Sequence, residues 1–338
     1  MKTFATAAAP HLPPRSSVRQ VMAEVLLALL PAIAVQAWLF GPGLLVQIAL
    51  GLLLAAAIES TALHLRGQQP QAGLADLSAA LTAVLFALCI PPICPWWISA
   101  IGLLFGLGLV KHAYGGLGLN LFNPAMAAYA LVLLLYPRQL SLWTAPLADL
   151  DLGQSLQAIF LGQLPASWDT LASATPLSSL RQLAGEAWRM PQIRELPLFG
   201  HYGAAGWEWI ALAYAAGGCY LVWRRIVAWQ VPAGVIGATL LLGGLAWLID
   251  AERHPAPLQH LAGGGLMLAA WFVAADPVTG CTSPRGRLLF GIGVAVLSLA
   301  IRRWGSHPDG VAFAVLLMNA AAPLIDRFTR PRVHGHAR

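Results

Sequence analysis

Charged residues are scarce in this chain of 338 residues, since Lys, Arg, Asp and Glu make up only 10% of it. Soluble globular domains carry roughly a quarter. The 20 basic residues outnumber the 14 acidic ones, but they lie in short connections and do not gather on one face, which argues against a nucleic-acid-binding protein. With 58% apolar residues, the composition predicts a protein that crosses a membrane several times.

Metal-binding and catalytic patterns are also missing. The cysteines are Cys89, Cys94, Cys219 and Cys281. Their spacing fits neither a zinc site nor an iron–sulfur cluster, and the nine histidines show no ligand spacing either. No phosphate-binding glycine loop follows a strand, and no Ser–His–Asp pattern is present. We therefore predict no metal site and no catalytic residue in this chain.

Long apolar runs dominate what is present. A membrane-spanning helix needs about 20 mostly apolar residues, and shorter ones are tolerated inside a bundle. We expect ten spans, at residues 20–40, 44–64, 76–94, 97–113, 123–137, 208–224, 231–249, 261–275, 287–303 and 310–326. The predicted fold is an all-α membrane protein. Its expected parts are a leader 1–19, a first five-helix half 20–137, a loop 138–207, a second half 208–326 and a tail 327–338.

The distribution of Lys and Arg predicts the orientation, because cytoplasmic connections retain positive charge. With the leader in the cytoplasm, most basic residues fall on that side, and the short outer connections carry only Arg253, Arg302 and Arg303. Both termini are then cytoplasmic and the loop 138–207 is extracytoplasmic. We expect a multi-pass membrane protein in this orientation.

The division into five plus five spans predicts that the second half is inverted relative to the first, because each half crosses the membrane an odd number of times. The segments "NPAMAAYALVLLLYP" and "GVAFAVLLMNAAAPLID" end the two halves, and both combine Asn, Pro and small residues. Inverted repeats with interrupted helices typically enclose a site near the bilayer midplane.

The stretch "KHAYGGLGLNLFNPAMAAY", residues 111–129, predicts irregular backbone, because its glycines permit unusual conformations and Pro124 lacks an amide donor. Asn120 and Asn123 each offer donors and an acceptor that suit the edge of a heterocycle such as a flavin. Alternatively, Asn123 caps the helix that Pro124 begins. Lys111 is interpreted as a side chain that extends to the membrane surface.

Two carboxylates fall in or beside predicted spans. Asp276 ends an apolar run, where a carboxylate needs a partner. Arg285 and Arg287 are the expected partners in a structural ion pair, and a cofactor or ion-path role is the alternative. Glu59 lies inside the second span and is a candidate for an ion or proton path, unless it reaches water at the helix end.

The polar stretch "DTLASATPLSSL", residues 169–180, interrupts the apolar pattern within the predicted outer loop. Its hydroxyl side chains, among them Thr170, Ser173 and Ser178, are ordinary solvated loop residues on physical grounds alone. Thr175 differs from the others, because Pro176 favours an extended conformation for it and directs its hydroxyl away from any local helix. An external hydroxyl of this kind is available for modification.

Several motifs together resemble the family of D subunits of the Rnf complex, the ion-translocating ferredoxin:NAD oxidoreductase. The resemblance runs from residue 15 to the C-terminus and is carried by "FNPAMAAY", "YGGLG", "SATPL", "RGRLLFG", "HPDGVAFAVLLMNAAAPLID" and "TRPRVHGH". It extends more loosely to the B subunits of the sodium-pumping NADH:quinone oxidoreductase.

The resemblance implies that FMN is esterified through its phosphate to Thr175. A flavin transferase reads a motif of the form Asp-Gly-x-Ser/Thr-x-Ala-Thr, in which Asp169 supplies the acid and Ala174 precedes the acceptor. Thr170 stands where Gly is usual, and Ala172 where a hydroxyl residue is usual. These two departures weaken the recognition motif and leave the acceptor intact.

The resemblance also implies a non-covalent riboflavin among the helices, toward the cytoplasmic side. It favours Asn120 and Asn123 as pocket residues, with Lys111 and Asp276 as further candidates. Glu59 and Asp276 are then candidates for the ion path.

The implied function is that of a membrane flavoprotein in electron transport, a translocase component that is inactive alone. Its implied partners are an extracytoplasmic FMN-carrying G subunit, a cytoplasmic NAD-reactive C subunit, the flavin transferase and membrane lipid. The transported ion is Na⁺ or H⁺. A B-type subunit of the quinone-reducing pump is one alternative, although that protein has a longer N-terminal extension. A small-solute channel or transporter is another, and it predicts no bound chromophore.

Overall fold

The computed structural model describes residues 17–200 and 202–330, so most of the expected leader and tail lie outside the described residues. The described chain is mostly helical. The first half contains α1 (Val18–Phe40), α2 (Gly43–Leu65), α3 (Pro70–Leu74), α4 (Ser78–Ala87), α5 (Trp96–Leu103), η1 (Leu104–Ala113) and α6 (Pro124–Leu135). Of these, η1 is a π-helix that continues α5 without a break.

The middle segment consists of short elements. These are α7 (Pro137–Leu140), β1 (Trp143–Thr144), α8 (Leu152–Leu156), η2 (Gln157–Leu161), α9 (Trp168–Leu171), β2 (Ala172–Ser173), α10 (Pro176–Gly185) and α11 (Met190–Arg194). The two strands pair antiparallel, with Trp143 opposite Ser173.

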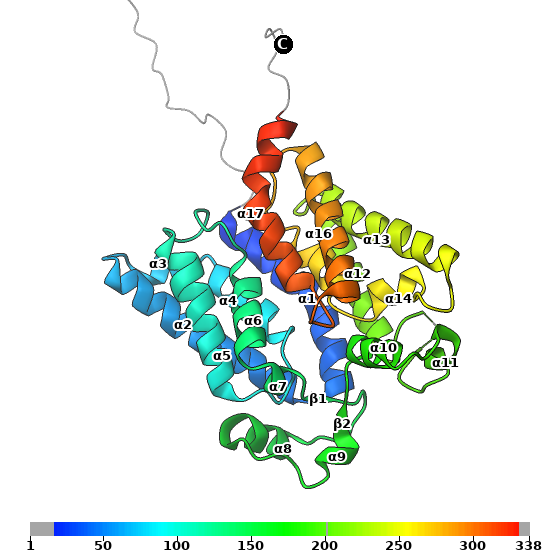
Figure 1. Cartoon of the computed structure of the whole chain (residues 1–338). Coiled ribbons are helices and arrows are strands. Elements are labelled where there is room, and N and C mark those ends of the chain that lie inside the picture. Colours follow the sequence, from blue (N-terminus) through cyan, green and yellow to red (C-terminus); the bar gives the residue numbers. More distant parts are fainter. Residues whose placement is uncertain (1–16, 201, 331–338) are drawn as a thin grey trace, which may run out of the picture.

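The second half contains α12 (Trp207–Trp223), α13 (Gln230–Ile249), α14 (Pro257–Ala262), α15 (Leu266–Leu268), η3 (Ala269–Val273), α16 (Pro284–Trp304) and α17 (Val311–Thr329). Figure 1 shows where these elements lie. The described chain begins and ends at one end of the helix bundle, and β1, β2, α8 and α9 lie at the opposite end. We call the first the Lys111 end and the second the Thr175 end.

Six helices among the described residues are long and apolar enough to cross a membrane, which makes this a multi-pass membrane protein. They are α1, α2, α5 with η1, α13, α16 and α17. Their bounds agree with the spans expected at those positions. The runs 123–137 and 208–224 also form single helices, α6 with 12 residues and α12 with 17.

The other two expected spans are not continuous helices. In the run 76–94, α4 ends at Ala87, and residues 88–95 contain three prolines, which cannot donate backbone hydrogen bonds and so end the helix. The run 261–275 is interrupted at three consecutive glycines, residues 263–265. Expecting one uninterrupted helix at each position was therefore wrong.

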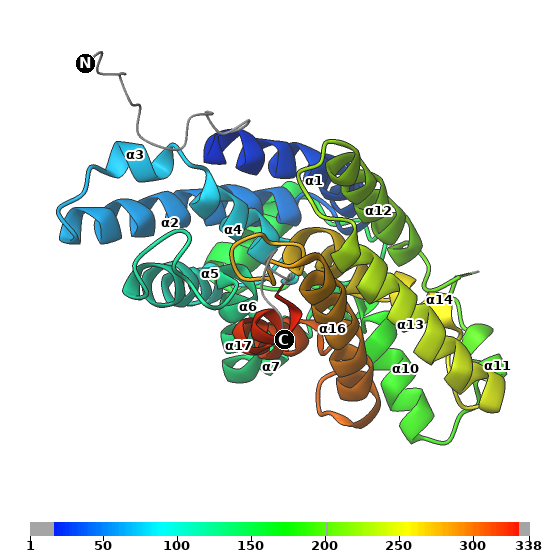
Figure 2. The ribbon, with the colours of Figure 1, turned by 90° about the horizontal axis from the view of Figure 1, so that it is seen from above.

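The two halves share an order of elements. The third element of each half is a short helix, a break of three residues and a second helical piece: α3 and α4 in the first half, α14 and α15 with η3 in the second. The first helices of the halves, α1 and α12, pack against each other, and so do the last helices, α6 and α17. Figure 2 shows the first half on one side of this interface and α13, α14 and α16 on the other.

The main hydrophobic core fills the space between the halves. Its buried side chains come from α1, α6, α12, η3, α16 and α17, and include Leu29, Met126, Tyr214, Phe290 and Val315. Any void within this interface is therefore lined by both halves, which is the usual situation of ligand sites in helix bundles.

Candidate functional site

Thr175 lies between a short paired strand, β2, and the helix α10. It comes two residues after β2, which pairs with β1, and it is the N-cap of α10 with Pro176 at the first helical position. Its backbone is extended, with φ −64° and ψ 151°, as its place before proline predicts. Its half-buried hydroxyl accepts from the Ser178 amide at 3.3 Å and lies 2.7 Å from Ser178 Oγ. The hydroxyl thus caps α10, where we expected it to point away from any helix.

A cavity of about 330 Å³, the Thr175 cavity, opens between the halves beside this hydroxyl. Its volume is within the range typical of small-molecule sites. Apolar and aromatic side chains make most of its wall, among them Met126, Tyr129, Trp143, Trp207 and Tyr214.

The aromatic side chains of this wall pack against one another. Trp143 and Trp207 lie with ring centroids 5.3 Å apart, and Phe40 packs edge-on against both, at 5.6 and 5.4 Å. Both tryptophans line the cavity, and the pairing of β1 with β2 brings Trp143 to the strand that precedes Thr175.

The glycine break at 263–265 forms another part of the wall. Asp309 accepts from the Gly265 amide at 2.7 Å and pairs with Arg302 at 3.1 Å. A Cβ on Gly264 would lie 2.4 Å from Leu177 Cδ1, so a larger residue here would displace the Leu177 side chain at the start of α10. The break therefore connects the second half to the segment that carries Thr175.

The segment expected as a recognition motif, residues 169–175, is partly exposed. Asp169 lies in α9 and is exposed, and so is Ala174, directly before Thr175. Thr170, at the usual Gly position, donates its hydroxyl to the Ser167 carbonyl at 2.8 Å. Ala172, at the usual hydroxyl position, lies in β2. Leu171 is buried and Thr175 half-buried, so exposure alternates along this segment.

A second void, the Asn120 cavity, lies between the halves toward the Lys111 end. It encloses about 70 Å³, and Val21 and Met22 from the start of α1 line it. The four side chains expected to form one pocket all line it: Lys111, Asn120, Asn123 and Asp276. They come from the end of η1, the connection before α6 and the connection after η3.

Asn123 joins the halves. Its side chain caps α6 by accepting from the Ala125 and Met126 amides, both at 3.1 Å, which confirms the capping interpretation. The backbone N–H of Asn123 donates to Asn319 Oδ1 at 3.0 Å, and its side-chain Nδ2 lies 3.5 Å from Asp276 Oδ2. A single side chain therefore caps a helix of the first half and contacts the second.

The partners expected for Asp276 were wrong. Its carboxylate accepts from the Val278 amide and the Thr279 hydroxyl, each at 3.0 Å. Arg287 instead donates to the Cys281 carbonyl, at 3.2 Å. The turn after η3 supplies donors nearer to Asp276 than either arginine, because donors two and three residues on fold back over the carboxylate.

The backbone that leads to Asn120 is irregular, as predicted, with positive φ at Gly115, Gly116 and Gly118. Asn120 Nδ2 donates to the Phe122 carbonyl at 3.1 Å, whereas Oδ1 is buried and has no hydrogen-bond partner among the described residues. An unsatisfied buried acceptor costs about 1–3 kcal/mol. This oxygen is therefore available to a donor on a ligand.

Lys111 does not extend to the surface. Its side chain is 2% exposed, and Nζ donates to Glu59 Oε1 at 2.6 Å and to Ser78 Oγ at 2.8 Å. The interpretation of Lys111 as a surface-reaching side chain was wrong, because Glu59 on α2 provides a buried counter-charge. Sequence reasoning treated the two residues separately and did not pair them.

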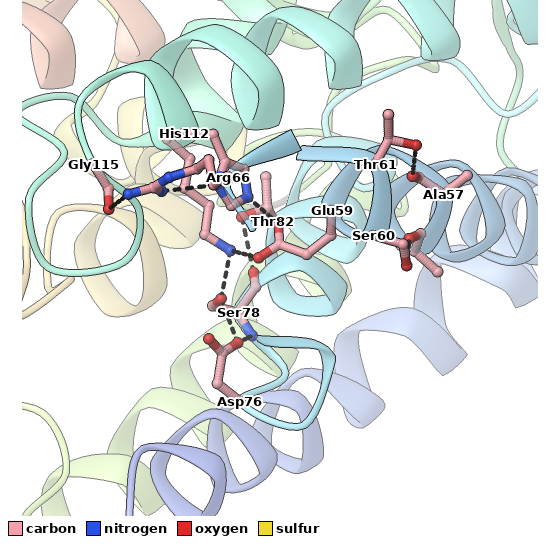
Figure 3. Close-up of polar contacts among 12 residues, drawn as sticks. Ala57, Glu59, Ser60, Thr61, Arg66, Asp76, Ser78, Thr82, His112 and Gly115 are labelled. Atoms are coloured by element: carbon pink, nitrogen blue, oxygen red, sulfur yellow. Dashed lines mark hydrogen bonds and ion pairs between the residues drawn. The ribbon is translucent and has the colours of Figure 1, made fainter. Parts of the chain in front are cut away.

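His112, Arg66 and Asp76 complete a polar cluster that the sequence analysis missed (Figure 3). His112 Nε2 lies 2.8 Å from Glu59 Oε2, and Arg66 donates to the Gly115 carbonyl at 2.8 Å. The signal that was available is the pair Lys111 and His112 at the end of an apolar run, directly before the glycine-rich stretch.

Comparison with known proteins identifies the family. Residues 5–335 match the model of the NQR2, RnfD, RnfE family. The chain is 41% identical to the D subunit of the ion-translocating oxidoreductase complex of Aeromonas hydrophila, over 99% of both chains. It is 44% identical to the corresponding protein of Pseudomonas aeruginosa, over 97% of this chain and 94% of the relative, and 40% identical to that of Vibrio vulnificus, over 99% and 100%. The chain therefore belongs to the NQR2, RnfD, RnfE family.

Proposed function

We propose that this chain is the D subunit of an ion-translocating oxidoreductase complex and carries two flavins, FMN esterified to Thr175 and a riboflavin in the Asn120 cavity. The observation that carries the proposal is the position of the Thr175 hydroxyl. Thr175 lines a largely apolar cavity between the halves and directly follows a partly exposed segment, residues 169–174.

The surroundings of Thr175 suit a phosphate ester. Its oxygen stands at the N-terminus of α10, a helix of 10 residues, where free amides and the helix dipole favour negative charge. The Ser178 amide and hydroxyl, which now bond the Thr175 hydroxyl, are donors within reach of phosphate oxygens. A phosphoryl group on Thr175 thus keeps the capping donors satisfied.

The Thr175 cavity suits a flavin ring. Its aromatic and aliphatic walls exclude water from a ring system, and Gln36, Ser141 and His307 provide a few polar groups. The flavin itself supplies one-electron and hydride chemistry when bound. The chain positions the ring and sets the polarity around it.

The Asn120 cavity suits the polar edge of a second flavin. Asn120 Oδ1 is an unpaired acceptor, and Lys111 has used two of its three N–H donors among the described residues. With 70 Å³, the cavity is smaller than a usual ligand site. Binding of a three-ring system therefore requires its lining side chains to move apart.

The two cavities are close along the interface. Neighbouring residues line one or the other: Leu85 and Leu88, Ala125 and Met126, Phe272 and Val273. Electrons from an extracytoplasmic G subunit enter at the Thr175 end and leave at the Lys111 end toward a cytoplasmic C subunit. In this proposal the chain crosses the inner membrane ten times in two inverted halves, with the third crossing of each half interrupted and both termini in the cytoplasm.

Ion transport is coupled through the helix bundle. Glu59 and Asp276 are the proposed ion-path carboxylates, since Glu59 is buried and the half-buried Asp276 lines the Asn120 cavity. The dependence of turnover on Na⁺, measured in the whole complex, distinguishes Na⁺ from H⁺. The chain alone does not oxidise ferredoxin.

The test of covalent attachment uses a denaturing gel under ultraviolet light. Protein from cells that express the flavin transferase gives a fluorescent band, and Thr175→Ala gives a dark one. Ser173→Ala is the matched control, since it removes another hydroxyl of the same segment at a position where the motif accepts any residue, and its band stays fluorescent. A dark wild-type band, as a channel without chromophore predicts, or a fluorescent Thr175→Ala band contradicts the proposal.

A further inference from the structure

The polar cluster at the Lys111 end is buried far more deeply than a structural surface ion pair. Glu59 is 1% exposed, Lys111 2% and His112 8%. Ionisable groups within membrane-spanning helices are costly and mark ion or proton pathways. This cluster lies in the helices α2 and η1, both within candidate spans.

The cluster separates two voids. On one side is the Asn120 cavity. On the other is an open vestibule of about 460 Å³, lined by Glu59, Arg66, Gln69, Asp76, His112 and other residues. Lys111 and Leu117 line both voids, so Lys111 is the only ionisable side chain shared by the two among the described residues. A proton that passes from the vestibule to the Asn120 cavity meets Lys111.

Short contacts run across this partition. Lys111 Nζ donates to Glu59 Oε1 at 2.6 Å, and Glu59 Oε2 lies 2.8 Å from His112 Nε2. The last contact is at ion-pair distance without hydrogen-bond geometry, so turning the imidazole ring completes the link. Arg66 Nη1 lies 3.5 Å from His112 Nδ1. Because Arg is always charged and donates, this contact favours a proton on Nε2, which faces Glu59.

Ser78 and Asp76 hold the lysine at the partition. Ser78 Oγ accepts from Lys111 at 2.8 Å and donates to Asp76 Oδ1 at 2.5 Å. The first of these contacts uses a second N–H of the ammonium. The third N–H has no acceptor among residues 17–200 and 202–330 and is available to the Asn120 cavity.

We propose that His112, Glu59 and Lys111 form a proton relay from the vestibule to the group that is reduced in the Asn120 cavity. This inference rests on the proposed riboflavin in that cavity. On reduction of that group, the Lys111 ammonium would donate one proton to it and become an amine. Vestibule water would protonate His112 at Nδ1, which would give up its contact with Arg66. His112 would then pass its Nε2 proton to Glu59, and Glu59 would pass a proton to the Lys111 amine.

The charged and titratable groups around Lys111 support transfer over simple charge pairing. Glu59 on α2, His112 on η1 and Asp76 before α4 face it from the vestibule side, with Arg66 at the end of α2. Asp276, after η3, lines the cavity on the other side. A structural ion pair needs only Lys111 and Glu59. Here Lys111 also lines the Asn120 cavity, and Glu59 also contacts His112, which lines the vestibule.

The test compares Lys111→Arg with wild-type complex. Arginine keeps the positive charge but does not release its proton. General acid–base catalysis contributes about 10²–10⁴-fold. We therefore expect Lys111→Arg to slow reduction of the non-covalent flavin by about 10²-fold or more. Single-turnover absorbance measures this rate, and the rate of reduction of the covalent FMN is expected to stay unchanged. In wild type, a pH dye records proton uptake that accompanies this reduction.

Further variants test the relay even if Lys111→Arg does not fold. His112→Gln leaves the Lys111–Glu59 pair in place and is expected to slow the same step and reduce its solvent isotope effect. Glu59→Gln is expected to remove a carboxyl band from the infrared difference spectrum of flavin photoreduction. Gln69→Ala, in the vestibule and outside the chain of contacts, is the control and behaves as wild type.

The outcomes separate the relay from the proposed function. Wild-type complex without any non-covalent flavin overturns both. Complex that contains the flavin, with Lys111→Arg and His112→Gln as fast as wild type, overturns the relay and leaves the flavin. Equal slowing by Gln69→Ala also overturns the relay, because the loss is then not specific to its members.

Discussion

The two cavities between the halves differ in how they can hold a ligand. The Thr175 cavity has about 330 Å³, and polar side chains in its wall, such as Gln36, Ser178 and Asp309, are hydrogen-bonded within the protein. The Asn120 cavity has about 70 Å³, and Asn120 Oδ1 in its wall has no hydrogen-bond partner among the described residues. An unpaired group can orient a ligand without a covalent bond, whereas groups that are already bonded orient it less. This difference would explain why, in the proposed function, one flavin is tethered and the other is not.

The largest effect is expected from breaking the charge pair at the Lys111 end. Lys111→Met leaves Glu59 buried without its lysine, and loss of one partner of a buried pair costs about 3–5 kcal/mol of unfolding free energy. The double variant Lys111→Met, Glu59→Gln removes both charges and costs less. Chemical denaturation in detergent measures both variants. Equal stability of Lys111→Met and wild type would show that the pair is not buried as described.

A smaller effect is expected at the Thr175 end from Gly264→Ala. The added Cβ would lie 2.4 Å from Leu177 Cδ1 and 2.8 Å from Asp309 Oδ2, so both side chains must move. Overpacking of this kind costs about 1–3 kcal/mol. The flavin stays attached to Thr175, but its visible absorption shifts, because the cavity wall moves.

Gly237→Ala is the matched control for that variant. Gly237 lies in α13, and a Cβ there would meet no atom within 4 Å. The flavin spectrum of Gly237→Ala is expected to match that of wild type. Its stability is expected to equal that of wild type or to exceed it slightly, because alanine has the better helix propensity. A Gly264→Ala spectrum identical to wild type would mean that the glycine break does not shape the flavin site.

The smallest effect on stability, with the opposite sign, is expected from Asn120→Leu. In flavin-free protein it removes a buried acceptor without a partner, which stabilises the fold by about 1 kcal/mol. In the complex it lowers the amount of bound riboflavin. Thermal unfolding and flavin extraction measure the two effects. A variant that is less stable and binds riboflavin normally would assign Asn120 a purely structural role.

Local features were predictable from sequence because local chemistry decides them. Length and apolarity gave the bounds of the six long helices. Pro124 after Asn123 gave the helix cap, and the glycines at 115, 116 and 118 gave the positive φ values. Pro176 gave the extended backbone of Thr175, although the capping of α10 by its hydroxyl was not expected.

Contacts between distant residues were not predictable in the same way. Glu59 and Lys111 are 52 positions apart, and only the packing of α2 against η1 brings them together. Asp276 was assigned arginine partners by sequence proximity, whereas neighbouring backbone and hydroxyl donors satisfy it. The breaks at 88–95 and 263–265 were interpreted as parts of helices, because hydropathy does not register where backbone hydrogen bonding stops.

The central claim is that the hydroxyl of Thr175 carries a flavin in the cavity beside it. Mass spectrometry of the peptide that contains Thr175, from protein made together with the flavin transferase, tests this most directly. The account predicts the mass of esterified FMN, localised by fragmentation to Thr175. An unmodified peptide, or the flavin on Ser173 or Ser178, would contradict it.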